Sequence, residues 1–368
     1  MSVSARRLQT WISSPRFDWA WVIGPHFYAV ILALALYPMV KDADVMPVWV
    51  WFVLVLCIDV AHVYSTLFRV YLDKNESQRF PTILWLIPFT VWFLGVLLYS
   101  VSPLSFWRFL AYLAVFHFIR QQYGFFRIYA GQELFSFSWQ RYINQYAIYF
   151  VTVIPVLIWH ASGPKDFNWF ISHDFIYFQS STLVFILNTI LVIAIAAYIC
   201  TEIQRTKRAG FINWPKNGIY LGTLLIWYLG IVQFNNDIIF TLTNVVAHGI
   251  PYLALIWVYK RHNKTSYQLA VFRRPNIVIF ILCLVGLAYI EEFLWAVLVW
   301  KEHLSVFFLN RNQVFETSVQ WLTYLVPLLA VPQGTHYVLD AFIWKIHNSK
   351  TNQWTRIINR SDLERVNF

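Results

Sequence analysis

Four histidines lie inside hydrophobic segments that are long enough to cross a lipid bilayer, namely His62, His117, His248 and His336. An imidazole in hydrocarbon is costly, so an ionisable side chain in a membrane helix usually faces the bundle interior and marks a functional site. Neutral imidazole is also a common protein ligand for iron and zinc. The four residues therefore predict a metal site buried in the membrane.

A carboxylate accompanies two of these histidines at helical spacing. Asp59 precedes His62 by three residues, and Asp340 follows His336 by four. Residues at these spacings are neighbours on one face of a helix. Each aspartate is therefore expected either to bind the metal or to orient its histidine through a hydrogen bond, as outer carboxylates in metal sites usually do. In either role, both aspartates are candidate residues of a catalytic site.

Amide side chains stand at similar spacing from the other two histidines. Gln121 follows His117 by four residues, and Asn244 precedes His248 by four. A site of neutral imidazoles with one or two carboxylates suits iron or zinc, whereas calcium and magnesium require mainly oxygen ligands. Iron is therefore expected as the cofactor, with zinc as the alternative.

The histidines lie at similar depths in their segments. At 1.5 Å per residue, the four are about 13–18 Å from the inner ends of the predicted helices. His26, on a segment that runs in the opposite direction, is about 12 Å from the same face. A metal needs its ligand atoms within about 2 Å of one point, so a common depth is a necessary condition for a shared site. His26 is therefore a fifth candidate ligand.

The elements that position these residues are predicted to be membrane helices. The chain is 59% hydrophobic and only 12% charged, whereas a soluble domain has about 25% charged residues. Apolar runs of about 20 residues, the length that spans a bilayer, recur along the chain. The sequence thus predicts an all-α polytopic integral membrane bundle of about ten transmembrane helices, at residues 19–39, 48–70, 81–102, 106–127, 140–161, 180–202, 216–233, 237–259, 276–299 and 317–345.

Basic residues set the expected orientation. With the amino terminus in the cytoplasm, most of the 28 lysines and arginines fall on the cytoplasmic side, as the positive-inside rule requires. Both termini are therefore expected in the cytoplasm, and in a bacterium the chain would occupy the inner membrane. This distribution of the net charge of +10 favours membrane lipids, and not nucleic acid, as partners. The expected parts are a cytoplasmic segment at 1–18 without signal-peptide features, a single membrane domain at 19–348 and a polar cytoplasmic tail at 349–368.

Two acidic residues interrupt the apolar segment at 276–299. Glu291 and Glu292 would lie deep in the bilayer if this segment crossed it without a break. Either the helix ends at this point, with Phe293 to Phe308 lying along the outer surface, or the two acids face a cavity. The sequence leaves both alternatives open.

Taken in order, the histidine segments resemble those of the Brp/Blh membrane carotenoid dioxygenases. Residues 329–345, which read LAVPQGTHYVLDAFIWK, are similar to a late segment of that family in which a proline precedes a histidine and an aspartate. The sequence Val115-Phe-His117-Phe resembles an internal His-Phe motif of the family. The region of His248 has the same place in the order along the chain as a third motif of the family. The family's early His-Gly-x-x-Asp does not occur here, and Asp59-Val-Ala-His62 has its aspartate before its histidine. The resemblance implies a histidine-ligated iron centre and the oxidative cleavage of β-carotene to retinal.

The leading hypothesis is an integral-membrane, iron-dependent oxygenase that acts on a lipid-soluble substrate arriving from the bilayer. Electrons would come from an external donor, unless the reaction is an internally balanced dioxygenation. No two histidines stand within four residues of each other, which disfavours the membrane di-iron class with clustered histidines. The alternatives are a zinc-dependent membrane hydrolase or lipid-modifying transferase, and a transporter of protons or metal ions.

Overall fold

The computed structural model describes residues 10–43, 45–79, 81–131, 133, 137–314 and 316–343. Over these residues the chain is helical and forms no β-strand, which confirms the predicted all-α class. Residues 1–9 of the predicted amino-terminal segment and the predicted tail at 349–368 lie outside the described residues. The division into domains stays a prediction.

The helices follow one another along the chain with short connections. The first half forms α1 Pro15–Asp18, η2 Trp19–Ile23, α2 Gly24–Val40, α3 Val48–Trp51, η3 Phe52–Val60, α4 Ala61–Thr66, η4 Leu67–Tyr71, α5 Lys74–Arg79, α6 Pro81–Val101, α7 Pro103–Ala130 and α8 Ser138–Ala161. The second half forms α9 Ser181–Ala209, α10 Trp214–Trp227, η5 Tyr228–Gln233, α11 Asp237–His262, η6 Lys264–Ser266, α12 Ala270–Arg273, α13 Ile277–Trp295, η7 Ala296–Trp300, η8 Leu304–Phe307, η9 Arg311–Gln313, α14 Val319–Leu329 and α15 Val331–Ile343. The η segments are π-helical or 3-10 turns that continue or connect the α-helices.

Among the described residues, seven helical stretches are long and apolar enough to cross a membrane, which indicates an integral membrane protein. They are Pro15–Val40, Val48–Tyr71, Pro81–Val101, Ser138–Ala161, Ser181–Ala209, Asp237–His262 and Ile277–Trp300. The predicted number of about ten spans is not confirmed, although helices also occupy the other three regions.

Those three regions differ from the seven spans for local reasons. The polar run Arg120-Gln121-Gln122 lowers the hydropathy of α7. The α10 helix carries Lys216 in its first turn. The last region is divided at Ala330 into α14 and α15, because Pro332 lacks the N–H that a continuing helix would need and suits the first turn of a new one.

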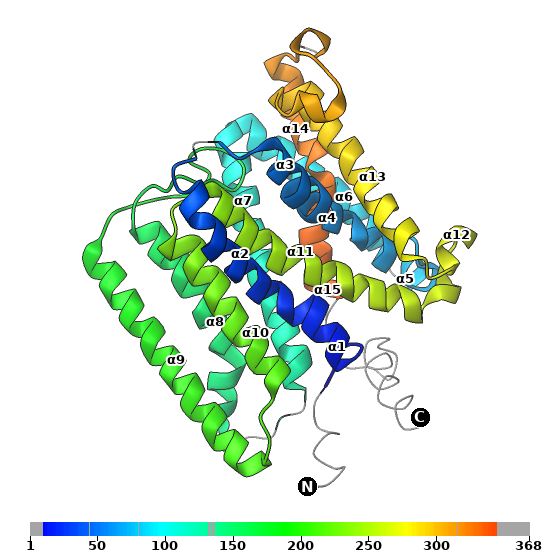
Figure 1. Ribbon diagram of the computed structural model, residues 1–368. Coiled ribbons are helices and arrows are strands. Elements are labelled where there is room, and N and C mark those ends of the chain that lie inside the picture. Colours follow the sequence, from blue (N-terminus) through cyan, green and yellow to red (C-terminus); the bar gives the residue numbers. More distant parts are fainter. Residues whose placement is uncertain are drawn as a thin grey trace.

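The α11 helix is the most buried of the seven spans and lies at the centre of the bundle (Figure 1). It packs against α2, α4 and α7. The α9 and α13 helices lie at opposite edges of the view, and few of their side chains are buried. The buried core therefore surrounds α11, and apolar helices such as α9 and α13 form the surface that faces lipid.

The second span, Val48–Tyr71, is irregular where the predicted site residues lie. The π-helical segment η3 ends at Val60, and α4 begins at Ala61. Asp59 is in η3 and His62 is in α4, so the change from the wider to the tighter helix falls between them. Such π-helical insertions are frequent at functional sites.

The span that contains Glu291 and Glu292 runs through without a break. The α13 helix continues past both acids to Trp295, and η7 extends it to Trp300. The expectation that the helix ends at the acids, with Phe293 onward on the outer surface, is therefore wrong for the residues up to Trp300. Glu291 is buried, because it lies on the face of α13 that packs against η3 and α4.

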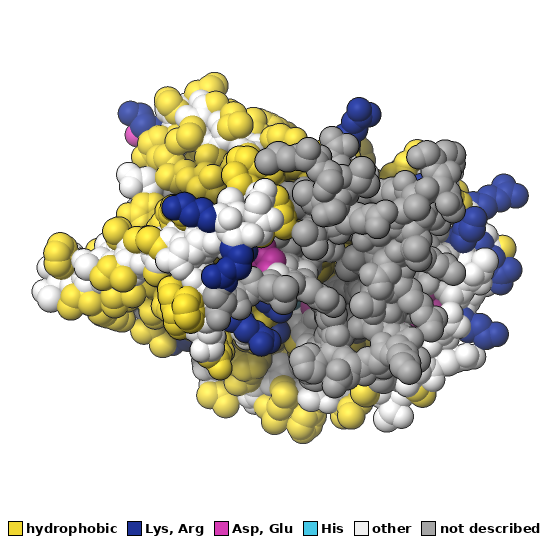
Figure 2. Space-filling model, turned by 90° about the horizontal axis from the view of Figure 1, so that it is seen from below, with side chains coloured by type: hydrophobic (Ala, Val, Ile, Leu, Met, Phe, Trp, Pro, Cys, Tyr) yellow, Lys and Arg dark blue, Asp and Glu magenta, His cyan; other side chains and the backbone are white. Residues whose placement is uncertain are grey.

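Basic side chains gather on the face of the molecule toward which the described chain ends, at the start of α1 and the end of α15, lie (Figure 1). Figure 2 shows this face from below, with several lysine and arginine side chains spread over it. Exposed examples are Lys207 and Arg208 in the last turn of α9, and Arg261 in the last turn of α11. The uneven charge agrees with the pattern on which the predicted orientation depends.

Candidate metal centre

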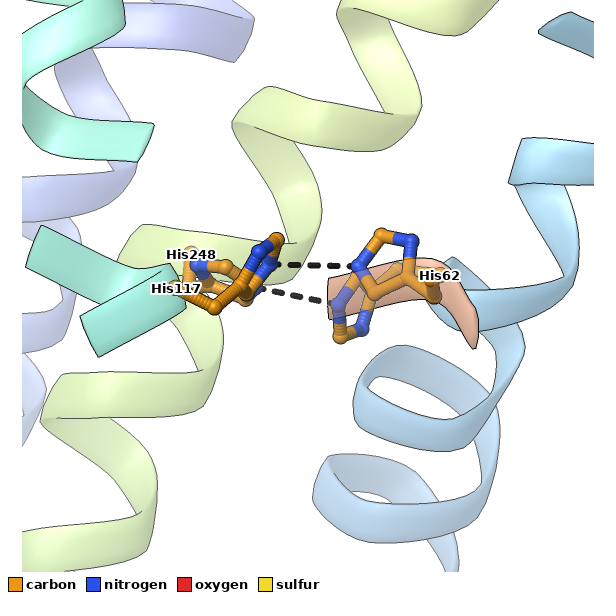
Figure 3. A group of neighbouring side chains, drawn as sticks. His62, His117 and His248 are labelled. Atoms are coloured by element: carbon orange, nitrogen blue, oxygen red, sulfur yellow. Dashed lines mark hydrogen bonds between the residues drawn. The ribbon is translucent and has the colours of Figure 1, made fainter. Parts of the chain in front are cut away.

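The structure brings together the four histidines that the sequence singled out. They come from four different helices, α4, α7, α11 and α15, and three of them are labelled in Figure 3. One ring nitrogen from each lies within 4.8 Å of those of the others, and all four side chains are buried. They are His62, His117, His248 and His336.

The four rings form two close pairs. The Nε2 atoms of His62 and His248 are 3.0 Å apart, and those of His117 and His336 are 3.2 Å apart. A tetrahedral iron or zinc ion with nitrogens at about 2.0–2.1 Å would set neighbouring nitrogens about 3.4 Å apart. Within each pair the Nε2 atoms are a few tenths of an ångström short of that spacing, and all four donor atoms lie within 4.8 Å of one another. Small movements of the side chains would therefore let the residues present hold a metal ion.

Two carboxylates lie beside the outward nitrogens of these rings. Asp59 Oδ1 is 3.6 Å from His62 Nδ1. Asp340 lies between two histidines, with one oxygen 3.9 Å from His117 Nδ1 and the other 4.0 Å from His336 Nδ1. Carboxylates at the ring nitrogen that is not directed at the metal are typical of residues that orient metal ligands. Of the two roles left open by the sequence, this position favours orientation over direct binding.

Two hydroxyl groups supply hydrogen bonds to the site, and of these residues Thr66 was missed in the sequence. The Thr66 hydroxyl is 2.6 Å from His336 Nδ1, and the Tyr252 hydroxyl donates to Asp340 Oδ1 at 2.6 Å. Thr66 follows His62 by four residues, and Tyr252 follows His248 by four. The same spacing that drew attention to Asp340 would have found Thr66.

The two amides do not bond to histidine rings. Gln121 Nε2 donates to the main-chain carbonyl of His248 at 2.8 Å, and Asn244 Nδ2 donates to the Phe240 carbonyl at 2.8 Å. The His248 ring is instead stacked on Phe118, with 3.6 Å between ring centroids and an interplanar angle of 8°. Gln121 therefore positions the backbone of α11, while an aromatic face fixes the His248 ring.

His26 is buried but is not a member of this group. Its Nε2 is 2.9 Å from Gln122 Oε1, and its Nδ1 is 3.2 Å from the Ile23 carbonyl. The Thr223 hydroxyl donates to the same Gln122 oxygen at 3.0 Å. His26 thus belongs to a separate polar cluster, because equal depth does not place a residue on the same side of a helix bundle.

Aromatic side chains also pack beside the centre. The Tyr337 ring is 4.8 Å from that of His117, and Trp169 contacts Phe118 at 4.9 Å. Trp169 belongs to the connection between α8 and α9, where the buried carboxylate of Asp174 accepts its backbone N–H at 2.9 Å. These rings exclude water and strengthen electrostatic interactions inside the site.

Comparison of the chain with protein-family models, curated proteins and solved structures finds no match. The character of the site therefore has to be argued from its own geometry. What the structure shows is a buried cluster of four histidines, inside a bundle of apolar helices, that can hold a metal ion.

Proposed function

We propose that the chain is an integral-membrane oxygenase that uses iron to oxidise a lipid-soluble substrate. One observation carries this proposal. Four buried imidazole nitrogens lie within 4.8 Å of one another in the middle of the helical bundle. Imidazole ligands suit iron, zinc and copper, and the likeness of residues 329–345 to the Brp/Blh carotenoid dioxygenases favours iron among them.

The residues around the histidines fit a divalent ion by charge. Four neutral imidazoles leave a bound ion with two positive charges, which a low-dielectric interior does not tolerate uncompensated. Asp59 and Asp340, at 3.6–4.0 Å from three of the rings, supply two negative charges. The complete assembly is then neutral when both aspartates are ionised. Thr66 and Tyr252 hold His336 and Asp340 in place through their hydroxyl groups.

The position of the centre favours a substrate that is dissolved in the bilayer. His62 and His248 lie within membrane-spanning helices, His117 lies in the equally long α7, and the Trp169 ring packs on Phe118 beside the centre. A polyene of the carotenoid class is the first substrate that the resemblance suggests. Iron, when bound, supplies the redox chemistry that activates dioxygen. Insertion of both oxygen atoms needs no further electrons, whereas insertion of one needs two electrons from an external donor.

The metal content of the detergent-purified protein, measured by mass spectrometry, tests the proposal. We expect near-stoichiometric iron, lost in His62→Ala, His117→Ala, His248→Ala and His336→Ala. The matched control is His262→Ala, an exposed histidine on the same helix as His248, which should keep its iron. If the purified protein contains zinc, and the four variants lose it, the proposed oxygenase is wrong and a hydrolase or transferase takes its place. Failure to bind any metal, also after anaerobic addition of ferrous ion, would overturn the proposal.

The basic face also supports a membrane orientation. We place this face, and with it both termini, in the cytoplasm, because lysine and arginine accumulate on the cytoplasmic side of membrane proteins. Cysteine labelling from either side of sealed vesicles tests this orientation. Labelling of a cysteine introduced at Lys207 only from the extracytoplasmic side would reverse it.

A further inference from the structure

Three carboxyl groups lie next to one another in the membrane-spanning part of the chain, beside the histidine cluster. Asp59 is in η3, and Glu291 and Glu292 are on α13, which packs against both η3 and α4 (Figure 1). The packing of these elements places the three carboxyl groups in the same part of the bundle. Such residues inside a membrane are expensive, and they commonly mark the path of an ion.

The carboxyl groups and His62 form a series that becomes deeper along the two spans. Counted from the ends of their spans at Trp300 and Val48, Glu292 is about 12 Å, Asp59 about 16 Å and His62 about 21 Å from the face opposite to the chain ends. Glu292 is half-buried, the Asp59 side chain is 25% exposed and that of His62 is 1% exposed. Glu291, next to Glu292, is 8% exposed and thus more buried than Asp59, and the deepest residue, His62, is the most buried of the four.

Two buried polar atoms in this series lack hydrogen-bond partners. Glu291 Oε1 accepts a hydrogen bond from Trp295 Nε1 at 3.3 Å, whereas Glu291 Oε2 has no hydrogen bond of normal geometry, with the Tyr64 hydroxyl as a neighbour of the carboxyl group. His62 Nδ1 also has none, and it lies 3.6 Å from Asp59 Oδ1. Unpaired buried polar atoms are rare because they are costly, so each requires an explanation. A cation beside Glu291 would pair with its free oxygen, while Nδ1 of His62 faces Asp59.

No lysine or arginine compensates these acids. Among the described residues of Val48–Tyr71 and Ile277–Trp300, the one basic side chain other than His62 is Arg69. It is at the far end of its span, where it pairs with Glu76 at 3.2 Å. Three carboxyl groups without a basic partner make this part of the bundle attractive to cations.

We propose that Asp59, Glu291 and Glu292 form an access site for a divalent metal ion on its way to the histidine cluster. The proposal rests on the proposed function, because the four histidines are the destination of the ion. Carboxylate oxygens hold such ions loosely, and imidazole nitrogens hold borderline ions more tightly. The ion would therefore move from Glu292 and Glu291 past Asp59 to His62, from the face opposite to the chain ends.

The rate at which the metal-free full-length protein binds Co²⁺ tests the proposal. Binding to imidazole nitrogens gives Co²⁺ a visible absorption band, which stopped-flow mixing can follow in detergent. In Glu291→Gln, Glu292→Gln and the double variant, we expect the band to form about tenfold more slowly, with its final position and intensity unchanged. Glu292→Asp, which keeps the charge, should bind at nearly the wild-type rate. The matched control is Asp42→Asn, an acid that is 88% exposed and lies outside the membrane spans.

The possible failures are distinguishable. Unchanged rates in the double variant would overturn the access site while leaving the metal centre in place. A changed absorption band in these variants would show that the glutamates are part of the centre itself, which also overturns the proposal. Failure of the wild type to bind Co²⁺ at all would overturn the metal centre, and the access site with it. Thermal unfolding of the metal-free variants confirms that they are folded.

Discussion

Replacing Asp340 by asparagine removes a negative charge that two of the four histidines share. The carboxylate lies 3.9 Å from His117 Nδ1 and 4.0 Å from His336 Nδ1, and the amide has the same shape. Loss of an outer carboxylate typically lowers metal affinity about 10- to 100-fold. Because Asp340 serves two ligands, we expect a loss of about 100-fold, or about 2.8 kcal/mol of binding free energy.

Two further variants calibrate this value. Asp59 lies beside a single histidine, His62, so Asp59→Asn should lower the affinity about tenfold. Thr66 offers a neutral hydroxyl to His336, and a net neutral hydrogen bond is worth about 0.5–1.5 kcal/mol. Thr66→Val should therefore have the smallest effect. The expected order of loss follows the charge of each group and the number of histidines that it contacts.

Anaerobic competition between the metal-free protein and a fluorescent chelator for ferrous ion gives the three affinities. Thermal unfolding without metal, measured for each variant, separates a loss of binding from a loss of folding. An affinity of Asp340→Asn indistinguishable from that of the wild type would refute the role of the carboxylate. A larger loss in Thr66→Val than in Asp340→Asn would refute the electrostatic reasoning.

Three other predictions concern the metal, the fifth candidate histidine and the buried ion pairs of Lys216. Ferrous ion at 100 times its dissociation constant should raise the free energy of unfolding by about 2.7 kcal/mol, as followed by thermal unfolding; the same gain in His248→Ala would contradict the site. His26→Gln should keep its metal, because its partners are Gln122 and Ile23, and loss of metal by mass spectrometry would return His26 to the site. Lys216 is fully buried, with Nζ at 2.6 Å from Glu133 and 2.5 Å from Glu202. Lys216→Met should therefore lower the free energy of unfolding by about 3–5 kcal/mol in chemical denaturation, and unchanged stability would show that this network contributes nothing.

The sequence predicted the four clustered histidines because depth in a membrane helix can be counted in residues. Hydrophobic length and the positions of basic residues define the ends of each helix, and the helical rise converts residue number into distance. Counting residues along one helix could not predict that Asp340 lies beside His117, since these residues are on different helices. It also overestimated the number of unbroken membrane helices, because the break between α14 and α15 at Ala330 depends on local backbone geometry. Hydropathy alone did not decide whether α13 continued past Glu291, whose burial against η3 and α4 is a tertiary effect.

His26 shows what depth alone leaves out, and α7 shows why. Gln122 follows His117 by five residues, and five steps of a helix turn a side chain by about 140° away from the first. The partner of His26 therefore points to a different side of α7 than His117 does. Gln121, at four residues and about 40°, stays on the side of His117 and reaches the His248 carbonyl. Two histidines at one depth thus share a site only if their partners also share a helical face, and by this criterion His26 and the four clustered histidines belong to different sites.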